Sequence, residues 1–346
     1  MRATPMDLDQ FEKRKADHIQ HSLDLKNEAL GASGLDRIHL VHEALPELDF
    51  QDVSIQSQFL GKKLQTPFFV CGMTAGHGDA PAMNRLLAKV CEARGWVMGV
   101  GSQRRDLESS SEEWKSFRSS FPRLGLIGNL GLTQVIQASV SQVRRVVTDL
   151  GADALAIHLN ALQEVLQPEG TPQFHGGFAA LKKLTQSLKI PILLKETGCG
   201  FSKKTLQRIS RLKLCAVDLS GLGGTHWGRI EGARAPEHSL QAQAAQTFAH
   251  WGESTVQSVL AAQGVLREKT EIWASGGVRS GLDAAKLIAL GSHRIGYAKP
   301  ALMAALKGEQ ALHQWMAQQE FELKVALFCT GSKNLEALRK KKWNLS

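Results

Sequence analysis

Residues 272–297 read IWASGGVRSGLDAAKLIALGSHRIGY, and their pattern indicates the architecture. An apolar run, Ile272 to Ser275, is followed by a helical pattern, Leu282 to Leu290, and then by a second run, Arg294 to Tyr297. Gly291 precedes the second run, as expected of a glycine that ends a helix. This succession predicts two parallel strands joined by a crossover helix.

The same alternation extends toward the amino terminus. Six further apolar runs span Pro67 to Gly72, Trp96 to Val100, Gly125 to Gly128, Ala154 to His158, Pro191 to Lys195 and Cys215 to Leu219. Helical patterns cover Ala80 to Arg94, Gln134 to Leu150, Gly177 to Leu188, Lys203 to Arg211 and Thr255 to Gln263. Gly95 and Gly151 repeat the position of Gly291, whereas the polar segment from Gln103 to Arg118 gives the weakest indication of a helix.

Eight runs alternating with helices predict an α/β protein, a (β/α)8 TIM barrel that folds as a single domain. A doubly wound open sheet is the alternative, but it normally has a glycine-rich turn after its first strand and fewer strands. We assign residues 1–65 to an N-terminal extension, 66–310 to the barrel and 311–346 to a C-terminal helical tail. Residues 220–253 form a long insertion after strand six, expected to lie over the active-site mouth.

Composition and charge narrow the classes of function. The 346 residues are 43% hydrophobic and 22% charged, as in soluble globular proteins with a large core. A formal charge of +9 suits either nucleic acid or small anions that are steered into a basic cleft. The only basic run, Arg339 to Lys342, is a tail with one neighbouring aromatic, Trp343, so the sequence favours small anions over nucleic acid.

We expect a cytoplasmic protein without a signal peptide or a membrane anchor. No stretch reaches the roughly 18 consecutive apolar residues that span a bilayer, and Met1 to Glu12 is polar and acidic. An odd number of cysteines without metal-ligand spacing suits a reducing compartment, and it predicts no zinc site. They are Cys71, Cys91, Cys199, Cys215 and Cys329.

Polar residues and glycines follow seven of the eight runs, where barrel enzymes place their catalytic groups. Gly276 and Gly277, after strand seven, let backbone amides approach a phosphate, with Arg279 nearby and Ala298 and Lys299 after strand eight as further donors. A lone Gly-Gly pair is otherwise a plain turn. A Rossmann fingerprint is absent, which favours a mononucleotide such as FMN.

Lys195 ends an apolar strand, where a desolvated cation needs a negative partner. The reduced isoalloxazine ring carries such a charge, and an ion pair with Glu196 or Asp218 is the alternative. The neutral donors suited to the edge of the ring are Thr74, Ser102 and Asn129.

Strand four is followed by His158, Asn160, Gln163 and Glu164. Glu164 suits Mg²⁺, which prefers one or two carboxylates together with phosphate oxygens and waters. Taken alone, Glu164 is more often a surface residue and His158 a structural histidine. Near the start, the run from Lys13 to His18 concentrates cations that suit a diphosphate, although terminal charge runs are usually solvated.

Together these residues resemble the type 2, FMN-dependent isopentenyl-diphosphate isomerases over nearly the whole chain. The motifs that carry the resemblance, in matching order and spacing, are Arg14-Lys15 through His18-Ile19, Met73-Thr74, residues 98–104 (MGVGSQR), 129–131 (NLG), 158–164 (HLNALQE), 167–170 (QPEG), Lys195-Glu196, 220–225 (SGLGGT) and 275–277 (SGG). This chain departs from the commoner pattern at Cys71-Gly72, Ala75, Leu222 and His226.

The resemblance implies an isomerase of isoprenoid biosynthesis that interconverts isopentenyl diphosphate and dimethylallyl diphosphate. It implies FMN that is active when reduced, Mg²⁺, NADPH or NADH as the reductant, and a homo-oligomer, either an octamer or a tetramer. Two alternatives remain. An FMN-dependent 2-hydroxy acid oxidase or related dehydrogenase shares the phosphate loop, but no His-Gly-x-Arg follows a late strand here. A non-catalytic flavin- or diphosphate-binding barrel is supported only by the departures.

The resemblance also implies roles for single residues. The substrate-binding residues are Arg14, Lys15, His18, Arg104, Asn160 and Gln163, with Gln163 and His158 catalytic and Glu164 the Mg²⁺ ligand. The residues that contact FMN are Met73, Thr74, Ser102, Asn129, Lys195, Ser220, Thr225, Gly276, Gly277, Arg279, Ala298 and Lys299.

Overall fold

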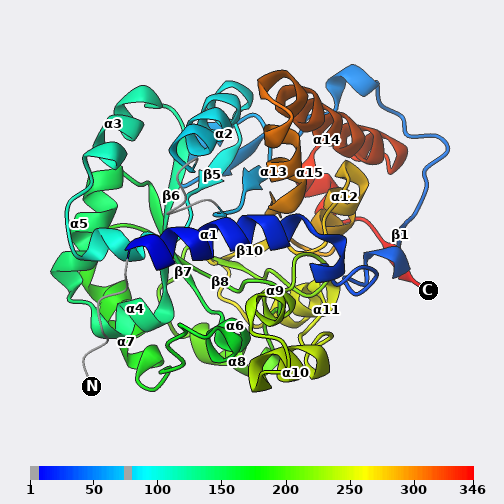
Figure 1. Cartoon of the computed structure of the whole chain (residues 1–346). Coiled ribbons are helices and arrows are strands. Elements are labelled where there is room, and N and C mark those ends of the chain that lie inside the picture. Colours follow the sequence, from blue (N-terminus) through cyan, green and yellow to red (C-terminus); the bar gives the residue numbers. More distant parts are fainter. Residues whose placement is uncertain (1–7, 74–79) are drawn as a thin grey trace.

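Eight parallel strands form a closed barrel in the order β10-β11-β4-β5-β6-β7-β8-β9, surrounded by helices (Figure 1). The structure, a computed structural model, describes residues 8–73 and 80–346, without the side chains of residues 8–13 and 15. The barrel strands are β4 (Phe68–Val70), β5 (Val97–Gly99), β6 (Gly125–Gly131), β7 (Ala154–His158), β8 (Ile192–Lys195), β9 (Ala216–Asp218), β10 (Glu271–Ala274) and β11 (Arg294–Tyr297). The predicted TIM barrel and its eight strands are confirmed.

The helices between the strands follow the sequence pattern with one correction. They are α2 (Ala80–Arg94), α3 (Glu112–Ser120), α4 (Leu132–Gln137), α5 (Val140–Leu150), α6 (Ala161–Leu166), α7 (Gly177–Ser187), α8 (Lys203–Ile209), α11 (Thr255–Ala262), α12 (Gly281–Ala289) and α13 (Lys299–Leu306). A single helix from Gln134 to Leu150 was wrong, because Ser139 begins α5 with a capping box that includes Gln142. The doubtful segment from Gln103 to Arg118 does contain a helix, α3.

Large side chains fill the amino-terminal half of the barrel. Phe69 and Trp273 pack inside it with ring centroids 4.9 Å apart. Phe59, from the hairpin of β2 (Ser57–Phe59) and β3 (Lys62–Leu64), packs against Trp273 and beneath the guanidinium of the buried Arg294. Since these side chains fill this half of the barrel interior, the interior can open into a cavity toward the carboxyl ends of the strands.

The chain outside the barrel gathers at that carboxyl end. In Figure 1, α1 (Leu8–Leu23) crosses the face of the barrel, and it packs against α13 and against α9 (Trp227–Arg234) of the insertion. The insertion also contains α10 (Leu240–Thr247), and α14 (Glu309–Cys329) and α15 (Leu335–Arg339) follow the barrel. Antiparallel pairing of β1 (Ile38–Leu40) with β12 (Trp343–Leu345) ties the extension to the tail. Within the described ranges, no helix is long and apolar enough to span a bilayer.

Gly151, one of the predicted helix-ending glycines, allows a test of the fold by substitution, with Gly264 as the comparison. Gly151 (φ 61°) and Gly264 (φ 68°) both adopt the left-handed conformation that costs other residues about 1–2 kcal/mol. A Cβ at Gly151 would also lie 2.7 Å from Arg118 Cγ, whereas a Cβ at Gly264 meets nothing within 4 Å. We expect Gly151→Ala to lower the melting temperature more than Gly264→Ala in thermal unfolding. Equal losses would mean that the Arg118 contact adds nothing.

Candidate active site

One cavity of about 480 Å³ opens at the carboxyl ends of the barrel strands, which is within the range of small-molecule sites. Every predicted site residue whose side chain is described lines it. They are Arg14, His18, Met73, Ser102, Arg104, Asn129, His158, Asn160, Gln163, Glu164, Lys195, Ser220, Thr225, Gly276, Gly277, Arg279, Ala298 and Lys299. Thr74 and Ala75 lie outside the described residues, and Lys15 belongs to α1 without a described side chain.

The glycine loop after β10 has the form of a phosphate site. Gly276 and Gly277 have φ values of 93° and 78°, and a Cβ on Gly276 would clash with the carbonyl oxygen of Gly221. The Thr255 hydroxyl donates to the Gly276 oxygen at 2.6 Å and fixes the loop. Among the described residues, neither glycine N–H has a protein acceptor, so both remain available to an anion. These features fit the phosphate of FMN.

Lys195 stands at the end of β8 in the floor of the cavity. Its Nζ donates to the backbone oxygen of Glu196 at 2.6 Å, and within the described chain no carboxylate lies within 4.0 Å of it. Asp218 instead accepts from Ser275 Oγ at 2.7 Å, and burial raises the pKa of Asp218 despite the nearby Lys195. The ion pair with Glu196 or Asp218 is therefore not formed, and the ammonium borders the space that fits a flavin ring.

Glu196 is held by the backbone of its own loop. Its Oε2 accepts from the N–H groups of Thr197, Gly198 and Cys199 at 2.6, 2.8 and 2.5 Å. Burial nevertheless raises the pKa of Glu196 to about 7. Glu196 therefore shapes the turn after β8 and does not line the cavity.

Asn129 connects the ends of β6 and β7. Its Nδ2 donates to the Val100 carbonyl at 3.1 Å, so its Oδ1 accepts from His158 Nδ1 at 2.9 Å. This hydrogen bond fixes the imidazole at the cavity wall. Ser220, which follows β9, has a φ of 38°, a left-handed conformation that few non-glycine residues adopt, and it lines the cavity.

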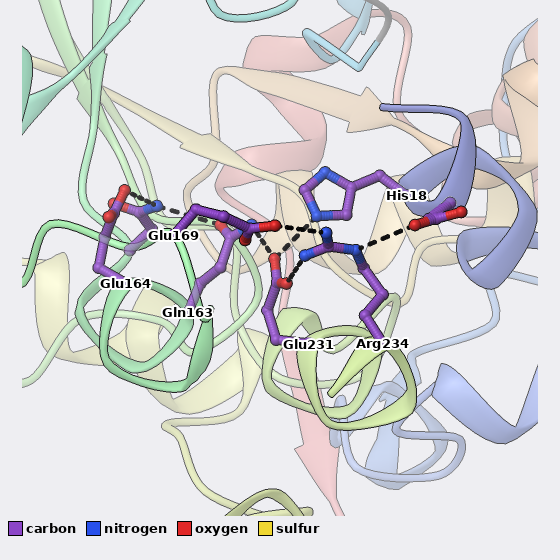
Figure 2. Close-up of polar contacts among 8 residues, drawn as sticks. His18, Gln163, Glu164, Glu169, Glu231 and Arg234 are labelled. Atoms are coloured by element: carbon purple, nitrogen blue, oxygen red, sulfur yellow. Dashed lines mark hydrogen bonds and ion pairs between the residues drawn. The ribbon is translucent and has the colours of Figure 1, made fainter. Parts of the chain in front are cut away.

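A hydrogen-bonded network joins α6, α9 and α1 across the cavity (Figure 2). Asn160 Nδ2 donates to Gln163 Oε1 at 3.0 Å and to Glu164 Oε1 at 3.1 Å. Gln163 Nε2 in turn donates to Glu231 Oε1 at 2.8 Å. The network therefore fixes the orientation of the Gln163 amide, with its oxygen toward Asn160 and its nitrogen toward Glu231.

Glu231 is completely buried between three partners. His18 Nε2 lies 2.9 Å from its Oε1, and Arg234 Nη1 lies 2.6 Å from its Oε2. Burial acts to raise the pKa of Glu231, but the hydrogen bond and charge of His18, with Gln163 and Arg234, lower it overall. A buried carboxylate anion thus faces the cavity through Gln163. Sequence reasoning missed Glu231 and Arg234, although both lie in the insertion expected over the mouth.

Arg14 brings a buried cation from α1 to the same side of the cavity. Only 5% of Arg14 is exposed, and its pKa is lowered by burial and by the charges of Arg104 and Arg234, against the influence of Glu169. Arg234 is itself bound to Glu169 at 3.1 Å. The arginines Arg14 and Arg104 therefore concentrate positive charge where an anion would be favoured.

Glu164 supplies a buried carboxylate to the part of the wall that Asn160 and Gln163 form. Its Oε2 accepts from the Thr171 N–H at 2.7 Å, and the neighbouring Asn160 Oδ1 is buried without a partner among the described residues. These oxygens suit Mg²⁺, although residues 8–73 and 80–346 contain no cluster of three or more His, Cys, Asp or Glu side chains that could hold a metal. Any Mg²⁺ here would need oxygens from a ligand.

The described positions at which this chain departs from the commoner pattern of the resembled family fall into two groups, one outside the cavity and one in its wall. Leu222 and His226 do not line the cavity. Leu222 pairs with Glu253 and Thr255 through its backbone, and His226 caps α9 by accepting from the Arg229 N–H. Cys71 and Gly72 do line the cavity, so they act on its shape.

Comparisons with known proteins agree with this geometry. Residues 153–345 match the FMN-dependent dehydrogenase family. The isopentenyl-diphosphate delta-isomerase of Bdellovibrio bacteriovorus is 49% identical over 339 residues, covering 96% of this chain and 97% of that protein. The protein of the same name from Halobacterium salinarum is 39% identical over 342 residues, covering 97% and 94%.

A solved structure shares the fold. The crystal structure of mandelate oxidase with (S)-2-phenylpropionate has a TM-score of 0.65 and covers 99% of each chain at 16% identity. At 16% identity this likeness shows the fold alone, whereas the isomerases match in sequence along nearly the whole chain. The resemblance seen in the motifs is confirmed, and the chain belongs to the isopentenyl-diphosphate delta-isomerase family.

Proposed function

We propose that this protein is an isomerase that interconverts isopentenyl diphosphate and dimethylallyl diphosphate in isoprenoid biosynthesis. The observation that carries the proposal is the gathering of the family motifs around one cavity with a basic end and a phosphate-type glycine loop. The reaction adds a proton to one terminal carbon and removes a proton two carbons away, without net redox change. It therefore needs acid-base chemistry in a closed, rigid pocket.

Cations at the basic end of the cavity hold the diphosphate in this proposal. Arg14, Lys15 and Arg104 would pair with its oxygens, and Glu164 would hold Mg²⁺, which would neutralise part of the charge of the diphosphate. His18 and Asn160 complete the wall. Because burial strengthens these interactions, the alkene is held in one position, which can lower the barrier by several kcal/mol.

The residues at the other strand ends of the cavity would hold FMN. Met73, Thr74, Ser102, Asn129, Lys195, Ser220 and Thr225 contact its ring and ribityl chain, and Gly276, Gly277, Arg279, Ala298 and Lys299 surround its phosphate. When bound and reduced by NADPH or NADH, FMN supplies the acid-base group that acts on the alkene. Gln163 and His158 border the reacting carbons, and Gln163 is held there by Asn160 and Glu231.

The proposal also covers the cellular compartment and the oligomeric state of the enzyme. We infer that it acts in the cytoplasm as a homo-octamer or tetramer. The five cysteines are all free thiols, which suits a reducing compartment. Light scattering after gel filtration measures the assembly.

Isotope exchange tests the reaction. The purified protein, with FMN, NADPH and Mg²⁺ in deuterated water, is expected to convert either isomer into the other and to place deuterium in both. The matched control omits the reductant, and exchange should then stop. Oxidation of a 2-hydroxy acid without isomer exchange would indicate the oxidase instead, and flavin binding without either reaction would indicate a non-catalytic barrel.

Metal dependence tests the assignment of Glu164. The substitution Glu164→Gln should raise the Mg²⁺ concentration needed for half-maximal rate by roughly tenfold or more, because a neutral amide is a poorer ligand for a hard cation. Flavin absorbance should be unchanged. Excess chelator should abolish activity in the unmodified protein, and full activity in chelator would remove Mg²⁺ from the proposal.

A further inference from the structure

Glu28, in the N-terminal extension, places its carboxylate between the two cations of the proposed phosphate site. Lys299 Nζ lies 2.6 Å from Glu28 Oε1, and Arg279 Nη2 lies 2.7 Å from Glu28 Oε2. Each carboxylate oxygen thus engages one cation, which is how two oxygens of a phosphate would engage them. All three residues line the cavity.

The position of Glu28 is fixed by its backbone. Residues 27–29 pair antiparallel with the loop after β9: the Ala29 N–H donates to the Gly224 oxygen at 2.9 Å, and the His226 N–H donates to the Asn27 oxygen at 2.8 Å. Arg229 Nη1 donates to the Glu28 carbonyl at 2.6 Å. The side chain therefore starts from a rigid point beside the glycine loop, and only its own torsions can move the carboxylate.

The pair with Lys299 is buried, since Glu28 is 8% and Lys299 6% exposed. Burial opposes ionisation of Glu28, but the hydrogen bonds and charges of Lys299 and Arg279 lower its pKa overall, so it is an anion at neutral pH. The three side chains therefore carry a net charge of +1, from two cations and one anion. A phosphate dianion beside the intact cluster would face a like charge at short range.

We propose that Glu28 is a resident counter-anion of the phosphate site, which a phosphomonoester must displace to reach Arg279 and Lys299. Glu28 thereby limits the affinity for the cofactor's phosphate and so reduces the preference of the site for FMN over riboflavin. The inference rests on the proposed use of FMN and adds a residue that no sequence motif assigned. A buried Lys299 without an anion would destabilise the flavin-free protein, and Glu28 prevents this.

If phosphate replaces the Glu28 carboxylate in this way, Glu28→Gln should destabilise the flavin-free protein and yet strengthen its binding of FMN. The flavin-free variant should melt at a lower temperature, because Lys299 loses its partner. At the same time its Kd for FMN should fall at least tenfold, because phosphate no longer competes with a carboxylate. The Kd for riboflavin, which has no phosphate, should stay within twofold. Flavin fluorescence titration measures both Kd values, and Asp36→Asn, an exposed carboxylate of the same extension, is the charge-matched control.

A second pair of variants keeps the test open if Glu28→Gln does not fold. Lys299→Met removes the buried cation, and the double variant with Glu28→Gln leaves no buried unpaired charge at this pair. In that background, loss of the Glu28 carboxylate should still lower the Kd for FMN several-fold, because Arg279 is freed. An FMN Kd that rises or stays constant on loss of Glu28 would overturn the proposal.

Binding of inorganic phosphate tests the role of Glu28 independently of the proposed use of FMN. If the unmodified protein binds neither flavin, the use of FMN fails, yet the anion site can still be examined by thermal unfolding in phosphate. A larger stabilisation by phosphate in Glu28→Gln than in the unmodified protein supports the counter-anion. Equal stabilisation in both proteins contradicts it.

Discussion

Replacing Gln163 with alanine should lower turnover by roughly a hundredfold or more while the substrate KM changes by less than about threefold. Gln163 has no charge to offer the diphosphate, and its amide is held between Asn160 and the buried Glu231 anion. Removing the amide breaks the hydrogen bond from Gln163 to Glu231 without touching Arg14 or Arg104. The loss should therefore appear in the chemical step.

Steady-state isomerisation at saturating substrate measures this effect, and FMN absorbance confirms that the cofactor is still bound. Gln173→Ala, an exposed glutamine after α6, is the matched control and should leave turnover unchanged. A raised KM with intact turnover would assign Gln163 to diphosphate binding instead. Single-turnover measurements distinguish slower chemistry from slower product release.

The substitution Arg14→Ala should act in the opposite way and raise the KM by roughly thirtyfold or more, with a smaller change in turnover. Arg14 is buried, and burial with the charges of Arg104 and Arg234 lowers its pKa although Glu169 and Glu231 act to raise it, so Arg14 experiences repulsion from these two arginines. A diphosphate relieves this repulsion, and alanine removes that gain.

Lysine at the same position should give an intermediate KM, because it keeps the charge and loses the two-pronged geometry. Arg123→Ala provides the control, since the Arg123 side chain is 83% exposed, lies before the amino end of β6 and does not line the cavity. Binding of the diphosphate should also weaken with added salt in the unmodified protein, and less steeply in Arg14→Ala. Unchanged KM with collapsed turnover would reassign Arg14 to the chemistry.

The strands and the cavity were predictable because their signals are local. Apolar runs and helix-ending glycines gave β7 and β11 with the bounds that the structure has. The carboxyl ends of parallel strands meet at one face, so residues such as His158 and Lys195 were expected to converge before any contact was known. The split of α4 from α5 escaped because the capping side chain of Ser139 outweighed a continuous helical pattern.

The two carboxylates that the sequence did not predict, Glu231 and Glu28, have partners that are distant in the sequence. Glu231 meets Gln163 across 68 positions of sequence, and Glu28 meets Arg279 across 251. Neither carboxylate follows a strand or completes a local motif, so a periodicity gives no hint of its partner. Their pairing depends on how the extension and the insertion fold over the barrel, which is tertiary information.

The β1–β12 ribbon has a consequence for biosynthesis. Residues 343–345 emerge from the ribosome after all eight barrel strands, yet they are the partners of residues 38–40. The nascent barrel can thus close while the segment that carries Arg14 and Glu28 is still without its carboxyl-terminal anchor. The pairing that anchors this extension therefore forms only after residues 343–345 have been synthesised.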